Sequence, residues 1–102
     1  MQYKIDFEAV GWERPMKGVR SRSVDRGGRR LRLVEYSEEM EPHWCERGHW
    51  GCILEGSFQI EFEGQTELYA AGDGVFIPAG AEHRHRATVL SGPVRAIFVE
   101  DV

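Results

Sequence analysis

The sequence of 102 residues has no apolar run close to the roughly 18 residues that a membrane-spanning helix needs. Its first residues, Met1 to Lys4, also lack the apolar core of a signal peptide. These two absences predict a cytoplasmic protein that has no membrane partner.

Cysteine is scarce, because the chain contains only Cys45 and Cys52. Two cysteines cannot build the disulfide framework of a small secreted domain. In a reducing compartment both are expected to be free thiols.

Positive charge is not in excess either, since the formal net charge is −4. The net charge of the chain therefore does not attract it to nucleic acid or to an anionic membrane. Arginines do gather between residues 20 and 32, but no recognition element or set of stacking aromatics accompanies them. On the segment 29–36 we interpret the alternating arginines as the solvent-facing side of a strand, and we expect no nucleic-acid partner. An anionic small ligand near these arginines is the alternative that their charge favours over nucleic acid.

A sustained helical periodicity is absent as well. Short segments rich in Val, Ile, Phe and Tyr instead alternate with glycine-containing turns. Strands are expected over residues 4–8, 29–36, 49–55, 57–63, 66–70, 74–78, 83–89 and 94–99. About eight to ten short strands predict an all-β sandwich or barrel. The length predicts one domain: residues 1–30 form an arm and edge strands, and residues 31–102 form the barrel.

Histidine and cysteine are concentrated in two short windows. Residues 42–56 contain His43, His49 and both cysteines, while His83 and His85 follow the glycine-rich run 72–80. Imidazole and thiolate are preferred ligands of transition metals. The two windows therefore predict one metal site assembled from two parts of the fold.

The second window resembles a motif of the cupin family, G-x5-P-x-G-x2-H, through Gly72, Pro78, Gly80 and His83. The motif normally closes with an asparagine, but this chain has Ala87 at that position. The proline and the glycines set a tight turn that delivers His83 at the start of a strand.

The first window resembles the other cupin motif in an altered form, His43-x-Cys45-x3-His49-x6-Gly56. Cysteine and histidine stand where the family has histidine and glutamate. The resemblance covers residues 31–99 and implies an antiparallel cupin barrel, a double-stranded β-helix or jelly roll. It also implies a metal held by His43, Cys45, His49 and His83. Such a ligand set favours Zn, Fe(II), Ni or Cu over Mn or Mg.

The resemblance further implies a small-molecule pocket beside the metal. His85, on the same strand face as His83, could be a metal ligand, a hydrogen-bond partner of a ligand or a general base. Glu55 is a second candidate proton carrier, Arg84 and Arg86 could steer an anion, and Trp44 could line the pocket wall or fill the core. One hypothesis is a metal-dependent oxygenase or isomerase whose substrate is unknown. The alternative is a non-catalytic small-molecule or metal sensor, which four protein ligands to one ion would favour. The sequence leaves enzyme and sensor undecided.

Each of these residues also has an ordinary structural interpretation. His43 could lie in a surface turn, Cys45 could be a small buried hydrophobe, and His49 could form a hydrogen bond within a core. A compact zinc finger made of His43, Cys45, His49 and Cys52 is a further rival. It would leave His83, His85 and the glycine-proline turn unexplained.

The segment 49–55 is apolar on both faces. His49, Gly51 and Ile53 are expected to face inward, and Trp50, Cys52 and Leu54 outward. A strand that is apolar on both faces needs a packing partner on each of them. Either the N-terminal arm or a second subunit covers the outer face, and we predict a homodimer through it.

Overall fold

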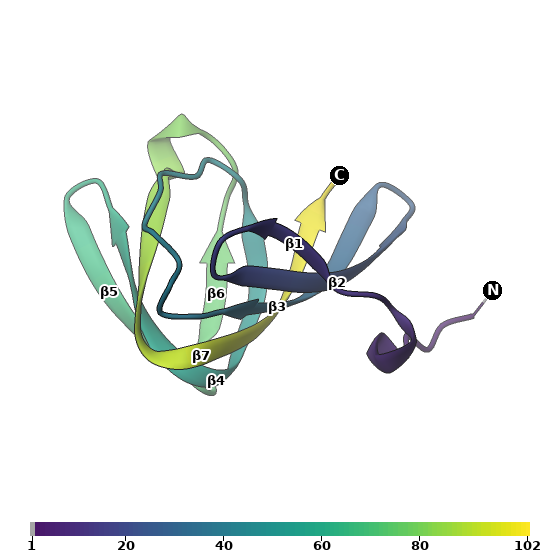
Figure 1. Cartoon of the computed structure of the whole chain (residues 1–102). Helices are drawn as coiled ribbons and strands as arrows, with labels where there is room; N and C mark the ends of the chain where they lie inside the picture. Colours follow the sequence, from purple (N-terminus) through teal and green to yellow (C-terminus); the bar gives the residue numbers. More distant parts are fainter. Residues whose placement is uncertain (1) are drawn as a thin grey trace.

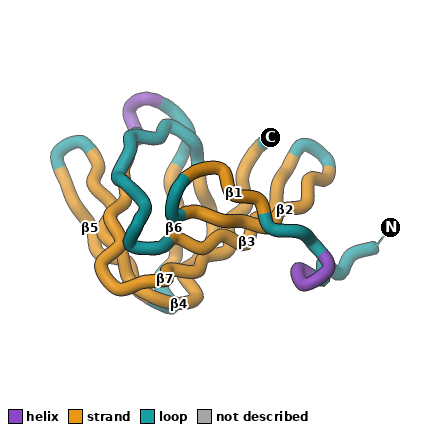
Figure 2. Tube along the Cα trace, viewed as in Figure 1, coloured by secondary structure: helices purple, strands orange, loops and turns teal. Residues whose placement is uncertain are grey.

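Antiparallel strands account for most of the fold in the computed structural model, which describes residues 2–102 (Figures 1 and 2). The strands are β1 (Glu13–Met16), β2 (Val19–Arg26), β3 (Arg29–Tyr36), β4 (His49–Phe62), β5 (Gln65–Ala70), β6 (Gly74–Ile77) and β7 (His85–Asp101). Two single-turn 3₁₀ helices, η1 (Phe7–Ala9) and η2 (Ala81–His83), complete the elements. The predicted all-β class is confirmed. No helix among these residues combines the length and apolarity that crossing a membrane requires.

The strands pair in the order β1-β2-β3-β7-β4-β5, and β6 pairs with β4. β4 and β7 are long and bent, and Figure 1 shows β7 curving around the lower side of the molecule to the C-terminus. Their pairing shifts register between Ile53 and Phe58, around Gly56. Gly56 has a φ of +80°, and a Cβ there would lie 2.4 Å from the carbonyl oxygen of Pro93. Glycine is therefore required at this bend. The segments 49–55 and 57–63, which the sequence predicts as two strands, form one bent strand.

The apolar core lies between the inward faces of β3, β4 and β7. Val34, Ile53, Val94 and Ala96 are at most 1% exposed. The predicted inward direction of Ile53 is thus confirmed. These residues form the closed, packed part of the interior.

The N-terminal part differs from the prediction of a strand over residues 4–8. Asp6 instead caps the 3₁₀ turn η1, because its carboxylate accepts a hydrogen bond from the backbone N–H of Glu8 at 3.1 Å. The arm then packs on β2, where the ring of Trp12 lies 3.9 Å from the guanidinium of Arg20 and 4.1 Å from that of Arg22. The arm therefore covers β2 and not the outer face of β4.

The arginines of β3 correct a second expectation. Arg30 and Arg32 share the inward face of the strand with Val34, and both line a cavity that the apolar core residues also line. They are not a solvent-facing row. Their positions follow from the two-residue alternation along β3, which places every second side chain on the same face as the buried Val34.

The second histidine window also folds differently from the prediction. Gly80, with a φ of +131°, precedes η2, and His83 is the last residue of that turn. β7 begins two residues later, at His85. The expected turn is present, but the strand was predicted to begin at His83, and this prediction is wrong.

Candidate metal centre

The site begins with a backbone bridge between the two windows. The N–H of Cys45 donates to the carbonyl of His85 at 2.8 Å, and the N–H of His85 donates to that of Cys45 at 3.0 Å. Opposed residues in such an antiparallel pair project their side chains on the same side. The bridge therefore sets the Cys45 thiol beside the His85 imidazole.

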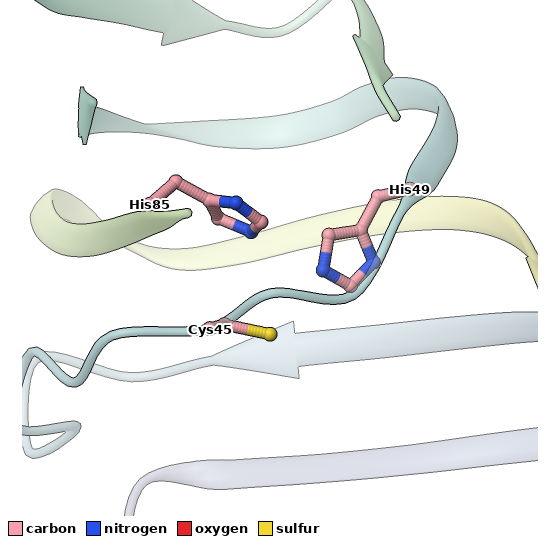
Figure 3. A group of neighbouring side chains, drawn as sticks. All are labelled: Cys45, His49 and His85. Atoms are coloured by element: carbon pink, nitrogen blue, oxygen red, sulfur yellow. The ribbon is translucent and has the colours of Figure 1, made fainter. Parts of the chain in front are cut away.

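His49 is the first residue of β4 and pairs with Ile77 of β6. Its ring meets that of His85 edge to face, with 5.3 Å between the ring centroids. One ligand atom from each of Cys45, His49 and His85 lies within 4.8 Å of the other two. Figure 3 shows the sulfur and the two rings directed at a common space. The structure thus gathers, from three separate backbone segments, three side chains whose donor atoms could hold a metal ion.

Both histidines in this group have one ring nitrogen fixed by an acceptor. Nδ1 of His49 lies 2.6 Å from Oε2 of Glu100, and Nδ1 of His85 lies 3.0 Å from the carbonyl oxygen of His83. A carboxylate or carbonyl partner holds a proton on Nδ1 and leaves the other nitrogen, Nε2, for Cys45 and its surroundings. Nε2 donates a hydrogen bond to the sulfur when it is protonated and can bind a metal ion when it is not. Metal-binding histidines in proteins usually donate their other ring N–H to a carboxylate or carbonyl in this way.

Glu100 is itself held in place by a second partner. It is 5% exposed, and its Oε2 lies 3.1 Å from Nη2 of Arg32. Burial raises the pKa of this carboxyl, but the hydrogen bond to His49 and the charge of Arg32 outweigh that effect and lower it. Glu100 is therefore a carboxylate that orients His49.

The thiol of Cys45 is activated by its neighbours. Hydrogen bonds from His49 and His85 lower its pKa to about 5 against the opposing effect of burial, and the backbone N–H of Arg47, 3.4 Å from Sγ, adds to them. Burial lowers the pKa of His49, but hydrogen bonds to Cys45 and Glu100 raise it by more. At neutral pH the sulfur is a thiolate, which is the form that binds metals.

A cavity of about 240 Å³ opens beside these three residues. Its deep part is apolar and includes Phe58, Ile60 and Phe98, while Arg32 and Arg47 lie among its polar lining. This volume is below the range of roughly 300–1,000 Å³ typical of sites for drug-sized ligands. The cavity suits a small molecule.

The other predicted metal ligands lie outside the three-residue group. His43 is exposed and lines the cavity, and its Nδ1 lies 3.3 Å from the carbonyl oxygen of Glu41. The side chain of His83 is 42% exposed, and its contribution to the group is the backbone carbonyl that fixes His85. Cys52 is not part of the group either.

Only some of the residues that were predicted to line a pocket or to carry protons line the cavity. His85 lines the cavity, whereas Glu55 is exposed and does not. Arg86 lines the cavity and binds Glu61 through two hydrogen bonds of 3.1 Å. Two further residues remain outside the cavity lining. Arg84 pairs with Glu63 at 2.8 Å, and Trp44 packs against both arginines, with its ring centroid 4.6 and 4.7 Å from their guanidinium carbons.

Sequence reasoning missed Arg32, Arg47 and Glu100. One signal could have found Glu100, because it has the same parity on β7 as the buried Ala96 and Phe98. Arg32 could have been found in the same way from Val34. For Arg47, which lies in the loop before β4, the sequence offers no comparable signal.

A cupin-domain family model matches residues 30–100, and the chain therefore belongs to the cupin family. The predicted resemblance and the predicted jelly-roll fold are confirmed. No curated protein matches the sequence at a significant level.

Solved structures agree on the fold. An RmlC-like cupin from Shewanella frigidimarina has a TM-score of 0.78 at 15% identity, over 100% of this chain and 93% of the other. KdgF from Halomonas sp. has a TM-score of 0.75 at 21% identity, over 92% and 89%. The polyketide cyclase RemF from Streptomyces resistomycificus has a TM-score of 0.74 at 25% identity, over 99% and 80%.

Proposed function

We propose that this cupin is a metal-dependent enzyme in which Cys45, His49 and His85 hold a transition-metal ion beside the small-molecule cavity. The observation that carries the proposal is the convergence of three electron-pair donors within 4.8 Å, with both histidines fixed through Nδ1. Donors without a hydrogen between them repel one another unless a cation lies among them. A shared proton can fill that role, and so can a metal ion.

The donor set fits zinc, iron(II), nickel or copper. One thiolate and two imidazoles are soft to borderline ligands, which these ions prefer over the carboxylates that suit manganese or magnesium. Ligands around one tetrahedral zinc ion lie about 3.4–3.6 Å apart, as its bond lengths require. Small side-chain rotations from separations within 4.8 Å reach that range. A bound ion would supply Lewis acidity and, if it were iron or copper, a redox couple.

The number of protein ligands favours an enzyme over a sensor. Four protein ligands would saturate a tetrahedral ion, whereas three leave a position for water or substrate. His43 and His83, which the sequence predicts as ligands, lie outside the group of three. We therefore propose an oxygenase or isomerase, and the polyketide cyclase among the structural relatives is a precedent for catalysis on this fold.

Metal analysis of protein purified without an affinity tag tests the ligand set. We expect close to one ion per chain after reconstitution, and a thiolate-to-metal charge-transfer band with cobalt(II). Cys45→Ser, His49→Ala and His85→Ala should each lose the ion. The proposal fails if the unmodified protein binds no ion near stoichiometry.

Matched variants separate this ligand set from the alternatives. His83→Ala leaves the backbone carbonyl that orients His85, and Cys52→Ser removes a thiol outside the group, so both should retain the ion. His43→Ala should do the same. Loss of the ion in Cys52→Ser would indicate a compact finger, and loss in His43→Ala or His83→Ala would indicate the four-ligand set.

The outer face of β4 supports a second proposal, that two copies associate there as a homodimer. Strand pairing sets Trp50 beside Phe76 and Val99, and Phe76 is 78% exposed. Leu54, on the same face of β4, is 49% exposed. Exposed apolar side chains gathered on one face are typical of protein interfaces.

Light scattering at micromolar concentration tests the homodimer. We expect twice the chain mass for the unmodified protein and the mass of one chain for Phe76→Glu. A single-chain mass for the unmodified protein would refute the association.

A further inference from the structure

We propose that the ligand of this cavity is a small organic acid, with an apolar body in the deep part and a carboxylate held by Arg32 and Arg47. The inference rests on the proposed function, because the ligand would lie beside the same ion. It adds the chemical class of that ligand. Three observations support it: the apolar lining of the deep part, a lining arginine with a single side-chain hydrogen bond, and a lining arginine without an ion-pair partner among residues 2–102.

The deep part of the cavity is suited to a hydrocarbon group. Phe58, Ile60, Val75, Ile77 and Phe98 line it, and each is at most 4% exposed. These side chains offer no hydrogen bonds. A neutral polar ligand would lose its contacts with water in this part without replacement. The volume of about 240 Å³ accommodates a short branched chain or a single ring.

Arg32 provides the first hydrogen-bond donor for such a carboxylate. Its Nη2 binds Glu100, but its Nε is buried and has no hydrogen-bond partner among residues 2–102. A buried donor normally has an acceptor. Arg22 and Arg95 have the same unpartnered Nε but do not line the cavity. Arg32 therefore lines the cavity with a guanidinium whose one side-chain hydrogen bond among residues 2–102 is that of Nη2 to Glu100, so it retains donor capacity for a ligand.

Arg47 provides the second group. Its guanidinium forms no ion pair or hydrogen bond with any side chain of residues 2–102, and its backbone N–H already contacts the Cys45 sulfur. Two other arginines of the cavity have dedicated carboxylates, Arg86 with Glu61 and Arg30 with Asp25. Arg47 thus carries an uncompensated positive charge at the site.

The charges around the cavity favour an anion. Among residues 2–102, Glu100 is the only acidic side chain in the cavity lining, and it is already shared by Arg32 and His49. A divalent ion at Cys45 would add more positive charge than the thiolate removes. A guanidinium binds a planar carboxylate through paired N–H groups. A carboxylate therefore matches both the charge and the hydrogen-bonding geometry.

Calorimetric titration with matched acids and amides tests this inference. The probes are phenylacetate and 3-methylbutanoate, their neutral amides, and acetate, which lacks the apolar body. With zinc-loaded protein we expect each acid to bind at least about tenfold more tightly than its amide, as charge-assisted hydrogen bonds imply. Acetate should bind more weakly than both larger acids.

Variants connect that preference to the named arginines. Arg47→Gln should weaken acid binding by about tenfold and leave amide binding unchanged, because it removes a charge-assisted contact. Arg32→Gln should act in the same direction. Arg29→Gln, an exposed position on the same strand and outside the cavity lining, should have no effect. Because Arg47 is exposed, its variant should fold even if Arg32→Gln does not.

The inference is overturned if the acids bind no more tightly than the amides, if Arg47→Gln changes nothing, or if no acid binds at millimolar concentration. Repeating the titration with metal-free protein separates this failure from that of the proposed function. If the protein holds no metal but still prefers acids in an Arg47-dependent way, only the metal proposal fails. If it holds the metal and shows no acid preference, only the ligand class is wrong.

Discussion

The two ends of the barrel interior differ sharply, although the same strands build both. At one end Val34, Ile53, Val94 and Ala96 are fully packed against one another. At the other end the same faces of β3 and β7 carry Arg32 and Glu100. The packed end stabilises the fold by excluding water. The polar end contains convergent donor atoms, which lower stability unless a ligand is bound.

The difference shows how a small barrel separates stability from chemistry. The inward face of β3 changes from Val34 to Arg32 within two residues, which is one step of the strand alternation. Changes at the packed end should therefore affect folding without affecting the site. Changes at the polar end should alter metal and ligand binding, and should affect folding mainly through the stabilisation that a bound ion or ligand adds.

The largest expected effect is at the packed end. Ile53→Ala removes a side chain that is 1% exposed and leaves a cavity, so we expect the free energy of unfolding to fall by about 2–5 kcal/mol. Urea denaturation measures this change. Metal affinity of the folded variant should be unchanged, and a parallel loss of affinity would show that the two ends are not independent.

Metal binding at the polar end should raise the free energy of unfolding of the chain by a comparable amount. An ion that binds only the folded chain, at a concentration 100 times its dissociation constant, stabilises it by about 2.7 kcal/mol. Thermal unfolding with and without zinc measures the effect, which should disappear in Cys45→Ser. Equal stabilisation of Cys45→Ser would place the ion elsewhere.

A smaller effect is expected when Glu100 loses its charge. Glu100→Gln removes the carboxylate that orients His49, and changes of this kind lower metal affinity by roughly 10–100-fold. Competition with a chelator measures the affinity, and circular dichroism checks that the variant is folded. Unchanged affinity would mean that Glu100 serves only to neutralise Arg32.

The smallest perturbation is a change of pH in the metal-free protein. With the pKa of Cys45 at about 5, its thiolate persists above that pH and is lost below it. In the Cys52→Ser variant, alkylation by iodoacetamide should be constant from pH 8 to about 6 and fall to half near pH 5. A rate that still rises between pH 7 and 9 would contradict a lowered pKa. Bound zinc should protect the thiol.

Much of the fold was predictable because alternation along strands survives in the sequence. Arg29–Tyr36 was predicted with the observed bounds, and the inward direction of Ile53 followed from the same rule. The joining of two segments into β4 was not predictable, because Gly56 permits a bend as readily as a turn. The prediction of a strand over residues 4–8 failed because the cap at Asp6 outweighed a short alternation of apolar and polar residues.

The candidate site was predicted in part. The two windows and the motif spacing identified Cys45 and His49 and located the turn before β7. The choice between His83 and His85 depends on η2, which delays β7 by two residues and sets His85 opposite Cys45. Linear spacing does not reveal a single 3₁₀ turn. Contacts between distant strands, such as that of Glu100 with His49, arise only from the pairing of β4 and β7.

An anomalous-scattering map from a crystal grown with zinc tests the central claim most directly. We predict one strong peak within bonding distance of the Cys45 sulfur and of one ring nitrogen each from His49 and His85. Protein atoms should leave at least one coordination position of that ion free. A peak at His43 or His83, or no peak among the three residues at full zinc occupancy in solution, would contradict the proposed metal centre.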